Sequence, residues 1–374
     1  MNNRKIRVGI THGDTNGIGY ELIFRAFENP DILEICTPVI YGSPKVAAYH
    51  RNALGIEANF SIINSSEEIE DGRVNMLPVF DEEIKVELGV PSEEANRAAA
   101  RALDRAITDY KEELIDVMVT CPVNNNHFVV DGYTIPDNAK YIESSIGEGH
   151  QGIDILMNKW MRVALMTDQI ALKDVAECIT VEGVIQKVAA FFATLRRDMR
   201  ISNPRIAVLA LNPNHCEERP GKEETEVIIP AVQKLADAGV CVFGPYQANE
   251  FFGNGDYCAF DGVLAMYHDQ GLVPLKALDP ENNIHYLGGL PLVSTAVDVT
   301  PRYDIAGQGK ANETALLHAI YHAIDGFRNR NNYDAPLAHP LPKLYHERRD
   351  DSDKVRFSIP RKHDNAYKER QKKQ

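Results

Sequence analysis

The chain has 374 residues, of which 44% are hydrophobic and 25% are charged, and both values are ordinary for a globular protein. This composition excludes a disordered, fibrous or disulfide-stapled protein, and the length predicts two domains. Lys and Arg total 40 against 54 Asp and Glu, a net charge of −14 that repels phosphate backbones and anionic membrane surfaces. We therefore expect neither a nucleic acid nor a membrane as a partner.

The cysteines and the N-terminal residues predict the compartment. The six cysteines are scattered with no C-x-x-C pair, which is typical of free thiols in a reducing compartment. The first residues lead straight into an apolar strand without the hydrophobic region of a secretory signal. No apolar run approaches the roughly 18 residues that a membrane span needs. We expect a soluble, cytoplasmic protein.

From the N-terminus onward, short apolar runs alternate with amphipathic stretches. The first runs read as strands at 6–10 and 38–42, and the stretches that follow them read as helices at 21–27 and 45–54. This alternation indicates βαβ units around a largely parallel sheet. The sequence thus predicts the α/β fold class.

A capped helix is predicted at 92–114, because Ser92 precedes two glutamates and an Ala-rich amphipathic run. It leads into 115–123, a continuous apolar run typical of a strand buried on both faces. After residue 330 the periodicity is lost and Pro and mixed charge increase, so 331–374 is predicted to be an irregular charged tail. Between them the alternation continues, with strands at 161–167, 205–212, 240–244 and 262–267 and helices at 181–199, 224–239 and 312–329.

A Gly-rich turn, T-H-G-D-T-N-G-I-G-Y-E (11–21), closes the first strand and opens a helix. Its backbone N–H groups and the positive helix end favour an anion or a hydroxylated ligand. The spacing matches neither G-x-G-x-x-G nor a P-loop, so the turn carries no dinucleotide fingerprint. The alternative is a tight turn in which glycines satisfy the backbone dihedrals. If the protein transfers a hydride, we expect Asp14 and Asn16 to shape this loop.

His268, Asp269 and Gln270 follow the strand 262–267 directly, at the end of a strand where open α/β sheets hold their ligands. A His-Asp step offers a metal-binding or proton-transfer nitrogen beside a carboxylate, although a hydrogen-bonded loop histidine is the alternative. Lys276 is a flexible point charge able to reach a phosphate. His318 and His322 have the four-residue spacing of zinc ligands but no third ligand, which favours an ordinary surface helix.

Taken together, several segments resemble the 4-hydroxythreonine-4-phosphate dehydrogenase family of pyridoxal phosphate biosynthesis. The resemblance runs from about residue 5 to residue 325, and its blocks occur in the family's order. They include ITHGDTNGIGYEL (10–22), VTCPVNNN (119–126), LAMYHDQGL (264–272), GLPLVST (289–295) and AGQGKA (306–311).

The resemblance implies two α/β/α lobes of the isocitrate and isopropylmalate dehydrogenase type, with the active site in the cleft between them. We expect residues 1–125 and 275–330 in the first lobe and 126–274 in the second. It also implies a homodimer that shares each site across its interface. The implied reaction is the oxidation by NAD of a small phosphorylated hydroxy acid, followed by decarboxylation, with a divalent metal (Zn, Mg, Mn or Co) held by three histidines.

The resemblance places the metal ligands at positions that depart from the family pattern. One family histidine falls on His268. The second falls on Gln169, beside Asp168, and the third on Asn214, with His215 one residue later. Amide oxygens suit Mg²⁺ or Ca²⁺ better than Zn²⁺.

The substrate positions depart as well. The family's substrate His and Thr fall on Asn138 and Ala139, and of its phosphate-binding Lys, Asn and Arg only the lysine is kept, as Lys276, with His285 and Ser294 at the other two positions. Replacing an arginine with serine removes bidentate, charge-assisted hydrogen bonds to phosphate. Affinity for a phosphomonoester should fall unless Arg302 supplies a substitute guanidinium.

Three hypotheses follow. In the first, the chain is a working dehydrogenase in which His268 and His215, with Asp168 or Gln169, rebuild a weaker metal centre. His268, with Asp269 beside it, is then the metal ligand or general base, and Lys276 binds the substrate anion. In the second, it is a catalytically impaired member that acts as a small-molecule-binding or regulatory dimer. In the third, it carries out another reaction, such as acyl-phosphate transfer, that needs no hydride acceptor. The first requires a partly exposed His268 that faces the cleft.

Overall fold

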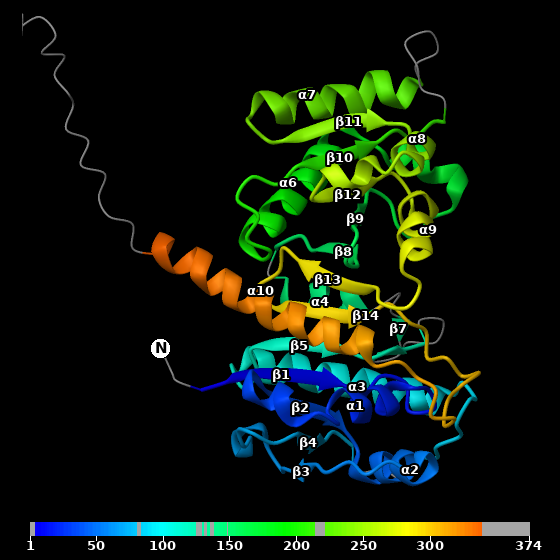
Figure 1. Ribbon diagram of the computed structural model, residues 1–374, viewed down its shortest axis with the longest axis vertical. Coiled ribbons are helices and arrows are strands. Elements are labelled where there is room, and N and C mark those ends of the chain that lie inside the picture. The colour runs from blue at the N-terminus through cyan, green and yellow to red at the C-terminus, as the bar shows by residue number, and fades with distance from the viewer. Residues whose placement is uncertain are drawn as a thin grey trace, which may run out of the picture. The chain divides into compact units, whose positions relative to one another are not determined.

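The structure, a computed structural model, describes residues 4–80, 84–124, 129–130, 133–134, 138–147, 149–213 and 221–338 (Figure 1). The chain divides into two units, Met1–Asp334 and Ala335–Gln374. Apart from the end of the last helix, every element below belongs to the first unit, and so does the candidate site.

A 12-stranded sheet runs through the whole first unit in the order β11-β10-β12-β9-β8-β13-β14-β5-β1-β2-β4-β3. A separate two-stranded pair joins β6 (Val129–Val130) to β7 (Tyr133–Thr134). The strands of the large sheet are β1 (Ile6–Thr11), β2 (Cys36–Gly42), β3 (Ser61–Ile62), β4 (Asn75–Pro78), β5 (Val117–Thr120), β8 (Ile153–Met157), β9 (Arg162–Leu165), β10 (Ile206–Leu209), β11 (Val242–Tyr246), β12 (Gly262–Ala265), β13 (Ile284–Gly288) and β14 (Val293–Val297).

The helices fall between the strands as the sequence predicts. The helix predicted at 92–114 is confirmed, and the Ser92 side chain caps it by accepting a hydrogen bond from the Ala95 amide at 3.1 Å. The helices are α1 (Gly19–Ala26), α2 (Pro44–Leu54), α3 (Glu93–Lys111), α4 (Asn138–Ile146), α5 (Val175–Cys178), α6 (Val181–Arg197), α7 (Ile229–Asp237), α8 (Ala248–Gly253), α9 (His268–Leu278) and α10 (Thr314–Ala338).

The largely parallel sheet is confirmed, with one antiparallel region at its centre. β13 runs antiparallel to both of its neighbours, β8 and β14, and β8 runs antiparallel to β9. The connections explain the change, because β8–β9 and β13–β14 are joined by short turns, whereas a parallel pair needs a longer crossover. The two late strands β13 and β14 therefore join the strands of the first part of the chain to those of the second.

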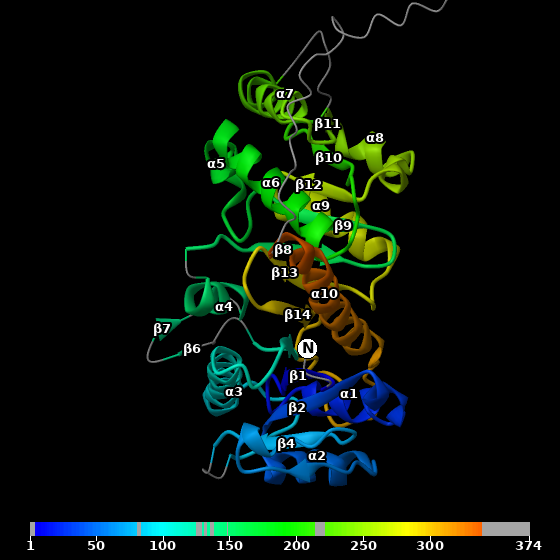
Figure 2. The same ribbon diagram turned by 90° about the vertical axis from the view of Figure 1, so that its left-hand side faces the viewer.

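The apolar core differs between the two faces of the sheet. One face carries a single large cluster of buried side chains beneath α1, α6, α7 and α10. The opposite face carries two separate clusters, one beneath α3 and α4 and one beneath α8 and α9. Figure 2 shows α3 and α4 on one side of the sheet and α1 and α10 on the other. The interruption between the two clusters lies over the central strands.

The last helix is longer than predicted. The irregular tail was expected to begin at residue 331, but α10 continues to Ala338. Two ion pairs with the end of α6 explain the extension. Asp334 pairs with Arg197, the last residue of α6, and Arg330 pairs with Asp198, the residue after it. Residues 339–374 lie outside the described part of the chain.

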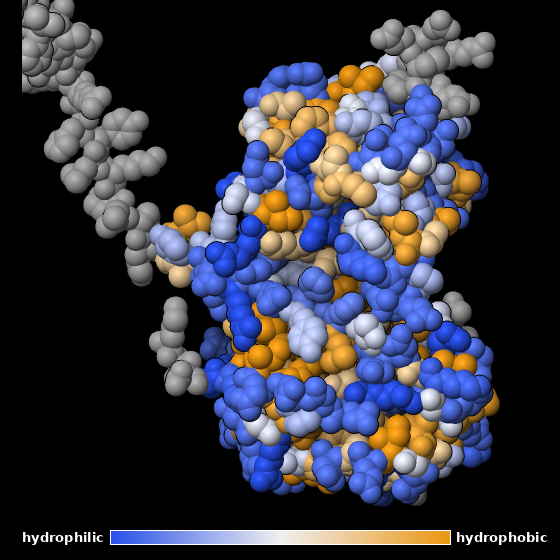
Figure 3. Space-filling model, in the orientation of Figure 1, coloured by the Kyte–Doolittle hydropathy of each residue, from blue (hydrophilic) through white to orange (hydrophobic). Residues whose placement is uncertain are grey.

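The surface in the view of Figure 3 is mostly hydrophilic, with apolar side chains gathered beside α10. Within the described residues, no single helix is long and apolar enough to span a membrane. One pair, Leu172–Cys178 with Val181–Arg197, meets the length and composition test only as two segments bent by 90°. The described cysteines, Cys36, Cys121, Cys178, Cys241 and Cys258, are free thiols.

Candidate functional site

A cavity of about 450 Å³ occupies the interruption between the two core clusters. Its walls come from the end of β5, the start of α4, the strands β8, β9, β13 and β14, and the helix α9. Both predicted lobes therefore contribute to it. The residues predicted from the sequence that line this cavity are Asn138, Ala139, Asp168, Gln169, His268, Lys276, His285 and Ser294.

The side chains on the cavity floor follow from the period of two along a strand. Ile155 of β8 and Tyr286 of β13 pair with each other and belong to the large cluster on the opposite face. Asp154 and Leu156, His285 and Leu287, and Ser294 and Ala296 point to the cavity face. Leu287 pairs with Asp154 on one side and with Ser294 on the other, so these three residues lie in one row across β8, β13 and β14. His285 lies in the next row on the same face.

His285 lies between two carboxylates on this floor. Its Nδ1 is 2.8 Å from Oδ2 of Asp154, and its Nε2 is 3.4 Å from Oδ1 of Asp298. Burial by itself lowers the pKa of His285, but the charges and hydrogen bonds of Asp154 and Asp298 outweigh burial and raise the pKa to about 10. The imidazole is therefore a cation at neutral pH.

Lys276 of α9 reaches the same carboxylate from the other side. Its Nζ lies 2.8 Å from Oδ2 and 3.0 Å from Oδ1 of Asp298. Burial raises the pKa of Asp298, but the hydrogen bonds and charges of His285 and Lys276 outweigh that effect and leave the pKa below its ordinary value. Asp154, His285, Asp298 and Lys276 thus form one continuous ionic network along the cavity wall.

His268 is the first residue of α9, directly after β12. Its side chain is 53% exposed and lines the cavity, as the dehydrogenase hypothesis requires. The ring Nδ1 is 2.8 Å from Oδ1 of Asp269, which leaves Nε2 for a ligand. Gln270 has a structural role, because it accepts a hydrogen bond from the Met266 amide and donates one to the Ala210 carbonyl, both at 2.7 Å.

Two of the predicted residues that the structure describes, Asp269 and Arg302, do not line the cavity. Asp269 is exposed and contacts the site only through His268. Arg302 is turned to the surface, where it pairs with Asp304 at 2.8 Å, so the expectation that it supplies a substitute guanidinium is wrong. Its backbone φ of 46° and this local pair hold it there. Asn214 and His215 lie outside the described residues.

The donors that the structure describes do not fit a histidine-rich metal centre. The cavity brings together one imidazole (His268), one carboxylate (Asp168) and one amide (Gln169) from the predicted set. In the part of the chain that the structure describes, no three His, Cys, Asp or Glu side chains are grouped closely enough to hold a metal ion. His318 and His322 of α10 likewise form no such group.

The Gly-rich turn serves close backbone packing. The amides of Asp14 and Ile18 donate to the carbonyls of Pro122 and Pro301, at 2.8 and 3.0 Å. A Cβ on Gly13 would lie 2.3 Å from the Pro122 carbonyl oxygen. As predicted for the loop's own architecture, Asp14 and Asn16 shape it: Asp14 accepts from the Asn16 amide and from the Tyr303 hydroxyl. Because these groups already have partners, the turn does not fit a dinucleotide cradle.

Sequence reasoning missed four charged residues that line the cavity, Lys140, Glu143, Asp154 and Lys187, and gave Asp298 no role. Each of the two aspartates had a visible signal. Asp154 is the single charged residue in the strand run I-D-I-L-M, and Asp298 continues the alternation Ser294, Ala296 at a period of two. A charged residue inside or at the end of a buried strand needs a partner, which is a reason to look for one.

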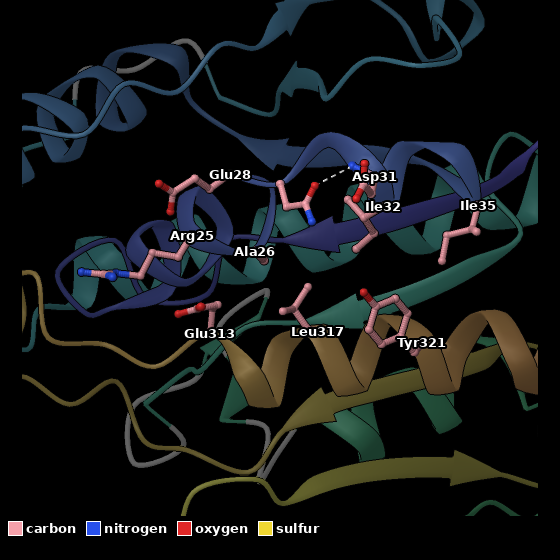
Figure 4. Close-up of a pocket in the computed structure, with 10 residues that line it drawn as sticks. Arg25, Ala26, Glu28, Asp31, Ile32, Ile35, Glu313, Leu317 and Tyr321 are labelled. Carbon is pink, nitrogen blue, oxygen red and sulfur yellow. Dashed lines mark hydrogen bonds between the residues drawn. The ribbon is translucent and has the colours of Figure 1, made fainter.

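A second hollow, of about 580 Å³, lies between α1, the 3₁₀ turn Pro30–Glu34 and α10 (Figure 4). Figure 4 shows Glu313, Leu317 and Tyr321 along one side of α10, facing Ile32 and Ile35. None of the residues predicted for the site lines this hollow. The ionic cavity over the central strands is therefore the candidate active site.

Comparison with known proteins identifies the family of the chain. The family model of the pyridoxal phosphate biosynthetic protein PdxA matches residues 34–323. The 4-hydroxythreonine-4-phosphate dehydrogenase of Bacteroides thetaiotaomicron is 48% identical over 358 residues, which cover 96% of this chain and 98% of that protein. The protein of the same name from a Sulfurihydrogenibium species is 32% identical, over 85% of this chain and 98% of that protein.

The fold matches as well. The crystal structure of a 4-hydroxythreonine-4-phosphate dehydrogenase from Burkholderia phymatum superposes with a TM-score of 0.70 at 29% identity, covering 87% of this chain and 99% of that one. The mixed α/β sheet is thus shared with solved relatives over nearly their whole length. With the family model, the identity to relatives and the fold in agreement, the chain belongs to the family of the pyridoxal phosphate biosynthetic protein PdxA.

Proposed function

We propose that the protein oxidises 4-phosphohydroxy-threonine, or a closely related phosphorylated hydroxy acid, with NAD, and that the β-keto acid formed then loses CO₂. The relatives named above are 4-hydroxythreonine-4-phosphate dehydrogenases, and the proposal places this chain in the same step of pyridoxal phosphate biosynthesis. The observation that carries it is the convergence of His268 and Lys276 of α9 with His285 of β13 on one cavity.

Different residues of the cavity bind the phosphate end of the substrate and act on its hydroxyl group. Lys276 and the protonated His285 are the cations of the ionic network at the cavity wall, which Lys140 and Lys187 also line, and we assign the phosphate group to this pair. His268 is the general base: its Nδ1 is held by Asp269, so Nε2 can take the proton of the substrate hydroxyl. Oδ1 of Asn138 is buried without a hydrogen-bond partner and lines the cavity, which suits a donor group of the substrate.

NAD supplies the hydride acceptor in this proposal. The residues that contact it are not assigned, because the Gly-rich turn is already satisfied by its own backbone. A divalent cation remains part of the proposal only through Asp168, Gln169 and His268, whose oxygen-rich donor set favours Mg²⁺ or Mn²⁺ over Zn²⁺.

We also propose a homodimer. Val273 and Leu278 of α9 and the nearby Trp160 are large apolar side chains that are 59%, 39% and 50% exposed. They lie on and beside the helix that carries His268 and Lys276, so a partner packed there would adjoin the cavity. Light scattering on the purified chain would give the mass, and a monomer at micromolar concentration would contradict this part.

The test is NADH formation by the purified protein with 4-phosphohydroxy-threonine, without metal and with Mg²⁺, Mn²⁺ or Zn²⁺. We expect turnover that His268→Ala reduces at least 100-fold, as loss of a general base does. The matched control is His318→Ala, on α10 and away from the cavity, which should retain wild-type turnover.

One observation favours the second hypothesis, a binding protein without turnover. In the network two carboxylates offset the two cations, so the cavity wall has little net charge with which to hold a phosphate dianion. Substrate binding by calorimetry without NADH formation, in a folded protein, would establish that alternative.

A further inference from the structure

The carboxylate of Asp298 lies between the two cations that the proposed function assigns to the substrate phosphate. Lys276 Nζ is 2.8 Å from Oδ2, and His285 Nε2 is 3.4 Å from Oδ1. The Asp298 side chain is 14% exposed, whereas that of Lys276 is 44% exposed. A buried anion of the chain itself therefore occupies the position that an entering anion would seek.

The charges of the network balance. Lys276 and His285 contribute two positive charges, and Asp154 and Asp298 contribute two negative ones. Asp154 contacts Nδ1 of His285, on the side away from Asp298, so only Asp298 contacts both cations. An anion that binds here must share or replace the hydrogen bonds that Asp298 accepts, and it meets the repulsion of that carboxylate.

We propose that Asp298 is an internal competitor for the anion subsite formed by Lys276 and His285, and that it sets how tightly the cavity holds a phosphate group. This inference rests on the proposed function in taking the Lys276 and His285 pair as the phosphate subsite. It assigns to Asp298 the role of lowering affinity for the charged end of the substrate, which keeps that end, and the phosphorylated product, from binding too tightly.

Two further contacts support the assignment. The backbone amide of Asp298 donates to the Asn283 carbonyl at 3.1 Å, so the main chain is held independently of the carboxylate. Asp154 remains beside His285 if the Asp298 charge is removed, so the imidazole keeps one of its two carboxylates. Neutralising Asp298 therefore leaves Lys276, the contact between His285 and Asp154 and the main-chain hydrogen bond of residue 298 in place.

The experiment measures the binding of inorganic phosphate to the full chain at pH 7 by calorimetry, with no cofactor or substrate. Asp298→Asn should lower the dissociation constant roughly tenfold, because it removes one repelling charge within a few ångströms of the subsite. The matched control is Asp304→Asn, which removes the same charge from the surface pair with Arg302 and should change the constant less than twofold.

Two further variants distinguish the loss of the Asp298 charge from misfolding. Asp298→Ser should also tighten phosphate binding, and Lys276→Met in the Asp298→Asn background should abolish the gain. In the wild-type protein, phosphate should shift the ¹⁵N resonance of His285 Nε2 as it replaces the aspartate. Unchanged or weaker phosphate binding in the folded Asp298 variants would overturn the proposal, and so would an unmoved His285 resonance at saturating phosphate.

This readout is independent of turnover. If the Asp298 variants bind phosphate more tightly but no NADH forms with 4-phosphohydroxy-threonine, the proposed dehydrogenase is wrong and the competitor role stands. If NADH forms but the variants bind phosphate no better, the competitor role is wrong and the proposed dehydrogenase stands.

Discussion

Arg330 of α10 and Asp198 at the end of α6 form an ion pair that is almost wholly buried, with side chains 5% and 1% exposed. The guanidinium donates to both carboxylate oxygens, at 2.7 and 2.8 Å, and also to the carbonyls of Leu290 and Pro291. These last two residues form the turn between β13 and β14. The pair therefore ties two helices to the turn that precedes the cavity strand β14.

Removing one partner of this pair should destabilise the fold strongly. Arg330→Met leaves the Asp198 charge buried and unpaired, and we expect the free energy of unfolding to fall by about 3–5 kcal/mol. Urea denaturation monitored by circular dichroism would measure it. Arg302→Met breaks the exposed pair with Asp304 and should cost at most about 1 kcal/mol, so equal losses in the two variants would contradict the prediction.

The network around His285 predicts a loss of stability at alkaline pH. The pKa of this histidine is about 10 in the folded protein and about 6.5 in the unfolded chain, so the folded state holds the proton more tightly. Its stabilising contribution is complete below pH 6.5 and is lost as the pH rises toward 10. Urea unfolding of wild type and His285→Gln at pH 6, 8 and 10 should show a steeper decline in the wild type. An equal decline in stability with pH in the two proteins would contradict this prediction.

His12 predicts a loss of stability at acidic pH. It is fully buried between Tyr20 and Phe80, and burial lowers its pKa to about 4, with the neighbouring His50 adding to the effect and a hydrogen bond to the Tyr41 carbonyl opposing it. The unfolded chain binds a proton near pH 6.5, so stability falls as the pH drops from 6.5 to 4. The full effect is roughly 3 kcal/mol. His12→Asn should flatten this part of the stability profile, and an unchanged slope would assign the acid sensitivity to other groups.

Gly13 predicts a coupling between the Gly-rich turn and the cavity. Its φ is 73°, and an added Cβ would lie 2.3 Å from the Pro122 carbonyl oxygen, next to Cys121 and Pro122 in the cavity wall. Gly13→Ala should therefore lower both stability and ligand binding. Gly239→Ala is the matched control, because its φ of 85° is equally unfavourable but the added Cβ meets nothing within 4 Å. The control should cost only about 1–2 kcal/mol and leave binding unchanged.

Local patterns predicted many of the elements and several site residues, but not β8, β13, β14, α4 or α9, which line the cavity. The cap at Ser92, the buried strand β5 and the placement of His268 after a buried strand all depend on residues close together in the sequence. The resemblance then identified Lys276, His285 and Ser294, which the structure brings to one cavity. Each of these positions lies at a defined place in a regular strand or helix.

The remaining features depend on pairings between distant segments. Asp154 meets His285 only because β13 runs antiparallel to β8, and a local pattern does not specify which strands become neighbours. Arg302 was expected in the cavity on proximity in sequence, but the adjacent Asp304 binds it at the surface. The extent of α10 was missed because Arg330 and Asp334 are held by residues of another helix more than a hundred positions earlier.

The central position of β13 and β14 has a consequence for synthesis on the ribosome. These strands, residues 284–297, separate β5 from β8 in the finished sheet. Until they emerge, the nascent chain exposes unpaired edges on both β5 and β8, and such edges invite pairing with other chains. The sheet closes only after most of the polypeptide has been translated. We therefore expect chaperone binding and aggregation during expression to occur mainly before β13 and β14, in the last quarter of the chain, have been synthesised.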